Sequence, residues 1–127
     1  MIFDTDILVW FLRGNENAEH VIRAAPREER CISIITYLEL IQGTQSKIEL
    51  NHLEKTITGA GFTILPVNEA ISWGAAKYLE EHKFISGLDI NDALIAATAS
   101  YHSRTLFTGN FKHFKDLDIS IRQFLKN

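Results

Sequence analysis

The chain begins with a short apolar run, Ile2-Phe3, that stops on an acid, Asp4. Such a run is typical of a buried strand in a parallel sheet, because both faces of that strand are covered. An acid at its end stands at the carboxyl edge of the sheet, where open α/β sheets bind their ligands. We therefore interpret Asp4 as a ligand-binding residue, with the N-cap of the following helix as its alternative role.

The rest of the sequence alternates between strand-like and helix-like segments. Further strands are expected at residues 31–34, 62–65 and 105–108, with a weaker edge strand at 119–121. Helices are expected from residue 5 to about 12 and at residues 16–25, 36–42, 48–58, 69–82 and 91–102. This alternation predicts right-handed βαβ units, and hence an α/β fold with a central, mostly parallel sheet of four to five strands and helices on both faces.

The composition is that of one globular domain covering residues 1–127. Of the 127 residues, 46% are hydrophobic and 23% are charged, which suits a single core. The single cysteine, Cys31, cannot form an internal disulfide, so a reducing cytoplasm is the expected compartment. Strand-like sequence at Ile2 leaves no room for a signal segment, and no apolar run is long enough to span a membrane.

The formal net charge of −3 argues against a nucleic-acid binder that relies on a broadly basic surface. Residues 102–115 nevertheless contain Arg104, Lys112 and Lys115 and no acid. A basic rim beside an acidic centre would suit a phosphate-bearing substrate. For any one of these side chains, a solvated loop position is the alternative interpretation.

Two more acids are candidates to join Asp4. Asp92 begins a segment, residues 92–99, whose alanines let a helix approach the sheet closely and bring Asp92 toward Asp4. Asp89, three residues earlier, is interpreted as the N-cap of that helix. Glu39 lies on an expected helix and is either a solvent-facing residue or a third carboxylate of the same site.

Carboxylates that converge in one crevice repel each other, so protons or a cation must neutralise them. The simplest cation is a hard one such as Mg²⁺. A further polar position, Thr108-Gly109-Asn110, follows the strand at 105–108. Thr108, like Thr5, could position water or phosphate, and the Asn110 amide could bind either group, with a plain turn residue as the alternative for Asn110.

Taken together, these fragments resemble a PIN domain, and more narrowly the VapC ribonuclease toxins of prokaryotic toxin-antitoxin pairs. The resemblance covers essentially the whole chain, and its fragments are specific in this order and spacing. They are Ile2-Phe3-Asp4-Thr5, Thr36-x-x-Glu39-Leu40 with Gly43 behind it, Asp92-Ala-Leu-Ile-Ala-Ala-Thr-Ala, and Leu106-Phe107-Thr108-Gly109-Asn110-x-x-His113-Phe114.

The resemblance implies an α/β/α sandwich that hydrolyses RNA phosphodiester bonds, with Asp4, Glu39 and Asp92 as an acidic triad around Mg²⁺ or Mn²⁺. Asn110 stands where members often carry a fourth acid, so this site has one charge fewer. The resemblance also implies a homodimer and inhibition by a cognate VapB-like antitoxin whose tail enters the active-site groove. Residues expected to position the RNA are Thr5, Thr108, Arg104, Lys112 and Lys115.

Three other interpretations remain open at this stage. A receiver domain has a similar length and fold, but it needs an aspartate after its third strand, and residues 63–68 offer none. Asp4-Thr5-Asp6 also resembles the start of aspartyl-phosphate phosphatases, although Asp6 more simply begins the first helix. A PIN domain that binds RNA without cleaving it is the third.

Residues 7–12 are apolar around the whole helix, so a second chain is expected to help cover Trp10 and Phe11.

Overall fold

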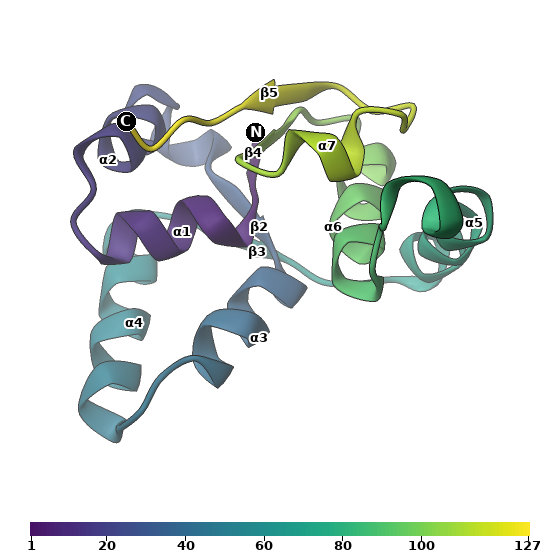
Figure 1. Ribbon diagram of the computed structural model, residues 1–127. Coiled ribbons are helices and arrows are strands. Elements are labelled where there is room, and N and C mark those ends of the chain that lie inside the picture. The colour runs from purple at the N-terminus through teal and green to yellow at the C-terminus, as the bar shows by residue number, and fades with distance from the viewer.

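A computed structural model describes residues 1–127. At its centre is a five-stranded sheet in the order β3-β2-β1-β4-β5 (Figure 1). The strands are β1 (Ile2–Phe3), β2 (Cys31–Ser33), β3 (Thr63–Leu65), β4 (Leu106–Thr108) and β5 (Ile121–Gln123). Every neighbouring pair is parallel. The expected α/β sandwich with a central parallel sheet is thus confirmed, and no strand runs antiparallel.

Seven α-helices surround the sheet. They are α1 (Thr5–Leu12), α2 (Glu16–Ala24), α3 (Ile34–Gln42), α4 (Lys47–Gly59), α5 (Glu69–Ser86), α6 (Ile90–Tyr101) and the short α7 (Phe111–Phe114), with a 3-10 turn at Arg27–Glu29. In Figure 1, α1, α2 and α4 lie on one side of the sheet and α5 and α6 on the other. The cap that the sequence indicated at Asp89 is present, since Asp89 Oδ1 accepts from Asp92 N at 2.8 Å, and Asn68 caps α5 in the same way, with Oδ1 accepting from Ile71 N at 2.8 Å.

The strands separate two apolar cores because successive residues of a strand point to opposite faces of the sheet. One core, packed against α5 and α6, receives Ile2, Cys31 and Leu106. The other core, packed against α1, α2 and α4, receives Phe3, Ile32 and Phe107. β1 is therefore buried on both faces, and the chain leaves this strand directly at Asp4.

Helix α6 packs closely because its inner surface is built of small residues. Residues 93 and 95–99 are all buried, and four of these six are alanine. A Cβ placed on Gly74 of α5 would lie only 3.4 Å from Ala97 Cβ, which shows how near the two helices come. This close packing fixes the position of Asp92 in the first turn of α6.

Four elements differ clearly from the expectation. Helix α3 begins at Ile34, two residues earlier than expected. Helix α5 continues beyond residue 82 to Ser86 and stops at Gly87, whose φ of 73° lies in the left-handed region that glycine tolerates. The edge strand β5 falls at Ile121–Gln123, two residues later than expected. The helix α7 was not expected, because four residues are too few to show a helical pattern.

The apolar surface of α1 is covered in part by other parts of the same chain. Trp10 is half-buried, and the ammonium nitrogen of Lys126 lies 4.5 Å from the centroid of its ring. The ring of Phe11 packs edge-on against Phe62. Lys126 and Phe62 thus cover part of the surface for which a second chain was expected, and the contact with a second chain stays a prediction. None of the helices combines the length and the apolar character needed to cross a membrane.

Candidate active site

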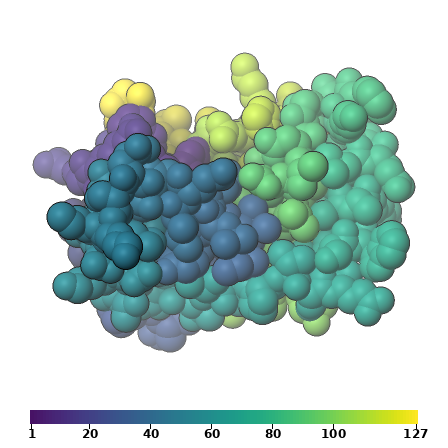
Figure 2. All heavy atoms as spheres, turned by 90° about the horizontal axis from the view of Figure 1, so that it is seen from below, coloured from purple at the N-terminus to yellow at the C-terminus, as the bar shows by residue number.

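The predicted site residues gather at the carboxyl edge of the sheet. Asp4 follows β1, Thr108 ends the neighbouring β4, and α3, which carries Glu39, begins where β2 ends. Figure 2 views the molecule from below, where the blue α3 lies between α4 and the green α5 and α6. In that view the purple N-terminal segment and the yellow-green segment after β4 come together above α3.

Asp4 is buried, with only 3% of its surface exposed. Its Oδ1 accepts a hydrogen bond from Thr5 N at 2.8 Å, which caps α1, and its Oδ2 accepts from Thr108 Oγ1 at 2.7 Å. Burial, followed by the nearby charge of Asp6, raises the pKa of Asp4 to about 7, and Asp92 adds to this rise while the two hydrogen bonds oppose it. Asp4 is therefore both the N-cap of α1 and a carboxylate whose ionised form is disfavoured by burial and by nearby acids.

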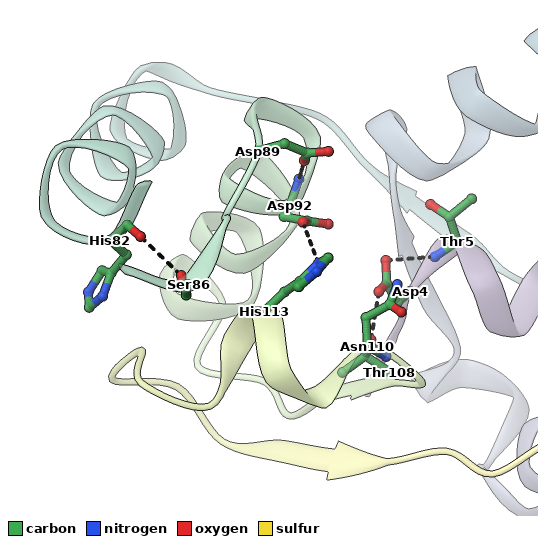
Figure 3. A network of polar contacts seen from close by, with 9 residues as sticks. All are labelled: Asp4, Thr5, His82, Ser86, Asp89, Asp92, Thr108, Asn110 and His113. Atoms are coloured by element: carbon green, nitrogen blue, oxygen red, sulfur yellow. Dashed lines mark hydrogen bonds and ion pairs between the residues drawn. The ribbon is translucent and has the colours of Figure 1, made fainter. Parts of the chain in front are cut away.

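Asp92 faces the same space from the first turn of α6. Figure 3 shows its side chain directed at His113, which reaches it from α7, with Asp4 and Asn110 nearby. Asp92 Oδ2 lies 3.1 Å from His113 Nδ1. Burial and then the charge of Asp89 raise the pKa of Asp92, while His113 lowers it. No lysine or arginine forms an ion pair with Asp92 or Asp4.

Glu39 is half-buried on α3 and joins the site through Thr5. Thr5 Oγ1 donates to Glu39 Oε1 at 2.7 Å and lies 3.0 Å from Thr36 Oγ1. Thr5 N in turn donates to Asp4. Glu39 is thus directed at the N-terminus of α1 rather than at solvent, and Thr5 serves as the link between two of the predicted metal ligands.

Thr108 and Asn110 have different roles at this edge of the sheet. Thr108 is fully buried, and its hydroxyl donates to Asp4 and accepts from Asn110 N at 2.9 Å. Thr108 therefore orients Asp4, which corrects the expectation that it positions a phosphate. The side chain of Asn110 is exposed and forms no cap bond to α7, so its amide is free to meet a ligand.

Among the expected cations, Arg104 does not join the site. It precedes β4, and its Nη1 lies 3.1 Å from the sulfur of Cys31 at the start of β2. In a parallel sheet these positions form the amino edge, opposite Asp4, as the position of Arg104 directly before the expected strand at 105–108 also implies. Lys112 and Lys115 are exposed on and directly after α7, the helix that places His113 beside Asp92.

Two residues at this edge were not singled out from the sequence. His113 entered only as part of a motif, and its contact with Asp92 depends on α7. Asp6 was interpreted as a helix-start residue, yet its Oδ2 accepts from Gly109 N at 2.9 Å. Burial raises the pKa of Asp6, while the bond from Gly109 lowers it. The one available signal was the presence of a second acid two residues after a strand-terminal acid.

These residues suit a hard divalent cation, although no three His, Cys, Asp or Glu side chains lie close enough to enclose one. The donors are carboxylate oxygens, burial raises the pKa values of Asp4 and Asp92, and neither acid is paired with a lysine or arginine. Mg²⁺ is commonly bound by one or two carboxylates, with waters and substrate phosphates completing its shell, so a closed protein cage is not required.

The fold and this edge can now be compared with known proteins. The sequence model of the PIN domain family matches residues 1–119, which is nearly the whole chain. The chain belongs to the PIN domain family. The match confirms the resemblance to a PIN domain that the sequence motifs indicated. The receiver interpretation has no support, since β3 ends at Leu65 and is followed by Pro66 rather than by an acid.

Solved structures similar to this PIN domain come from toxin–antitoxin complexes. A toxin-antitoxin complex from Klebsiella pneumoniae is 27% identical with a TM-score of 0.79, over 96% of this chain and 95% of that chain. VapBC-1 from nontypeable Haemophilus influenzae is 27% identical with a TM-score of 0.78, over 97% and 98%. FitAcB from Neisseria gonorrhoeae is 25% identical with a TM-score of 0.76, over 98% and 96%. No curated protein matches the sequence.

Proposed function

We propose that this chain is an endoribonuclease that depends on a divalent metal ion, and that it acts as the toxin of a VapBC-type toxin-antitoxin pair. The observation that carries the proposal is the buried Asp4, held at the sheet edge near Asp92 with no lysine or arginine paired with either acid. The similarity to the solved toxin–antitoxin complexes over nearly the full length of the chain supports the toxin role.

In this proposal Asp4, Glu39 and Asp92 hold Mg²⁺, for which Mn²⁺ substitutes. The bound ion supplies positive charge for the phosphoryl oxygens and acidifies water for the attack. Thr108 and Thr5 fix the two oxygens of Asp4, and Thr5 also fixes Glu39. His113 orients Asp92 through the contact between its Nδ1 and Asp92 Oδ2.

The RNA backbone is proposed to approach from the exposed side of the turn after β4. The Asn110 amide can donate to a phosphate oxygen, because its side chain is exposed beside the acids. Lys112 and Lys115 supply positive charge along the same approach. Contacts of this kind fix the position of the backbone but carry no sequence information, so the RNA target is selected elsewhere on the surface.

The test is RNA cleavage by the purified protein in Mg²⁺ or Mn²⁺, compared with the Asp4→Asn and Asp92→Asn variants. Both substitutions keep the size of the side chain but remove a carboxylate, and cleavage should fall by at least about 10²-fold because the charge that holds the ion is lost. EDTA should abolish cleavage by the wild type.

Asp116→Asn serves as the matched control, since Asp116 is an exposed acid that lies outside the site. It should cleave RNA like the wild type. Undiminished cleavage by Asp4→Asn, or full activity in EDTA, would refute the proposal. A wild-type protein that binds RNA in the presence of Mn²⁺ without cutting it would instead point to a non-catalytic PIN domain.

The proposal includes two protein partners. A groove of about 850 Å³ runs between α1, α3 and α4, and its lining includes Thr5, Glu39 and apolar side chains such as Ile48 and Leu53. We assign this groove to a segment of the cognate VapB-like antitoxin, whose basic tail would reach the acids of the proposed site. The second partner is another copy of the chain, in a homodimer. A cytoplasmic location stays a prediction from the free, buried Cys31.

A further inference from the structure

We infer that Asp6 is a positioning residue of the active site. It clamps the turn Thr108–Gly109–Asn110 to the start of α1, and so fixes the positions of Asp4 and Asn110 relative to each other. The inference rests on the proposed ribonuclease function for its catalytic consequence, but not for the clamp itself. It gives a role to an acid that the proposed metal-binding set does not use.

Both carboxylate oxygens of Asp6 are engaged by backbone groups. Oδ1 accepts from Ile7 N at 2.9 Å within the first turn of α1, and Oδ2 accepts from Gly109 N at 2.9 Å across the sheet edge. The residue is only partly exposed. A charged acceptor makes a stronger bond to an N–H group than a neutral one does, so this side chain ties a helix start to a strand end firmly.

Gly109 is matched to this contact. A Cβ at this position would collide with Asp6 Oδ2 and would come within 3.3 Å of Asp6 Cγ. Gly109 is not among the glycines with a positive φ, so backbone conformation does not explain the glycine. The close approach of the carboxylate does explain it, because only a residue without a side chain leaves room for the Asp6 oxygen.

The clamped turn carries two groups of the site. Thr108, on one side of Gly109, donates to Asp4 Oδ2. Asn110, on the other side, donates its backbone N–H to Thr108 Oγ1 and exposes its side chain. Moving Gly109 would therefore shift both the partner of Asp4 and the amide of Asn110. Asp6 thus places a further carboxylate behind the turn that carries Asn110.

The experiment compares Asp6→Ala, Gly109→Ala, the double variant Asp6→Ala/Gly109→Ala, and Asp6→Asn. We expect each alanine substitution to lower kcat for RNA cleavage by roughly 10²-fold, the size of effect produced by a small misplacement of catalytic groups. The double variant should be no slower than either single variant, because both remove the same contact. Asp6→Asn should restore most of kcat, since its amide oxygen can still accept from Gly109 N.

Glu69→Ala is the matched control, because Glu69 is also an acid in the first turn of a helix but lies on α5, which follows the edge strand β3, two strands away from β1. It should leave kcat unchanged. A second readout needs no RNA: the amide proton of Gly109, identified in ¹⁵N-glycine-labelled protein by its loss in Gly109→Ala. Its resonance should move upfield in Asp6→Ala, move upfield by a smaller amount in Asp6→Asn, whose neutral acceptor makes a weaker bond, and stay in place in Glu69→Ala.

The two readouts separate this inference from the proposed function. If the wild type does not cleave RNA, the proposed function fails while the Gly109 resonance still tests the clamp. An unchanged Gly109 resonance in Asp6→Ala would overturn the inference, as would additive losses in the double variant. Mn²⁺ affinity should also survive in Asp6→Asn. A loss as large as that in Asp4→Asn would make Asp6 a metal ligand and overturn its role as a positioning residue.

Discussion

At the scale of single residues, the burial of Asp4 beside Asp6 and Asp92 decides how the site responds to pH. The native pKa of about 7 lies well above the ordinary aspartate value of 3.8. A raised native pKa means that the folded state keeps a proton that the unfolded state has released between these two values. The free energy of unfolding of the metal-free protein therefore falls as pH rises from about 4 to 7.

Asp4→Asn should remove this fall in the free energy of unfolding at rising pH. In EDTA at pH 8 we expect the variant to be more stable than the wild type by an amount on the order of a few kcal/mol, because no buried charge remains at position 4. At pH 4, where the wild-type Asp4 is protonated, the two proteins should be nearly equal. Urea denaturation at both pH values measures the difference.

Mn²⁺ provides the control for this prediction. It should stabilise the wild type at pH 8, where Asp4 is ionised, and should stabilise Asp4→Asn much less. If the wild type and Asp4→Asn lost stability in parallel between pH 4 and pH 8 in EDTA, the burial of Asp4 would not be the cause of the pH dependence.

At the scale of elements, α1, α3 and α4 form the groove that we assign to the antitoxin. Its lining includes Ile48, which is 82% exposed at the start of α4, as well as Glu39 of the proposed site. An amphipathic segment fits such a groove through its apolar face. Only the packing of three helices creates it, so no single segment of the sequence predicted it.

Ile48→Glu should weaken binding to the protein encoded next to the gene for this chain by about 10-fold or more, since a charge would be buried in the interface. Asn51→Glu is the matched control, because Asn51 is exposed on α4 but does not line the groove. Isothermal titration calorimetry compares the two, and RNA cleavage by both should equal that of the wild type. Equal affinity of the two variants would remove the groove from the interface.

At the scale of the whole molecule, three exposed apolar side chains lie together in sequence where α5 meets α6. Phe84 is 90% exposed there, and Ile85 and Ile90 are exposed as well. Exposed apolar residues that cluster on a surface favour association with another chain. We therefore place the proposed homodimer contact at this connection rather than at Trp10 and Phe11, which the chain partly covers itself.

Phe84→Glu should convert a dimer into a monomer, as measured by sedimentation velocity over a range of concentrations, because a charge would replace a buried apolar contact. Leu125→Glu is the matched control, since Leu125 is also exposed and apolar but lies near the C-terminus. A wild-type protein that sediments as a monomer at every concentration would contradict the homodimer itself.

The sequence alone determined the α/β class, the parallel sheet and most helix bounds. These follow from local patterns: apolar runs such as Ile2-Phe3, caps such as Asn68 and Asp89, and the alternation of strand and helix. It also indicated Asp4 and Asp92, because a strand-terminal acid and a helix-start acid in a parallel sheet face the same edge.

Only the tertiary structure decided which side chains meet. Arg104 and Cys31 are 73 positions apart, yet Arg104 Nη1 lies 3.1 Å from the sulfur of Cys31. Asp6 and Gly109 are 103 positions apart and form a hydrogen bond. Such contacts depend on strand order and on backbone approach, which no local pattern encodes. The sequence thus placed the carboxylates at one edge, and the packing decided that Asp4 is the buried one and that Asp6 anchors the turn beside it.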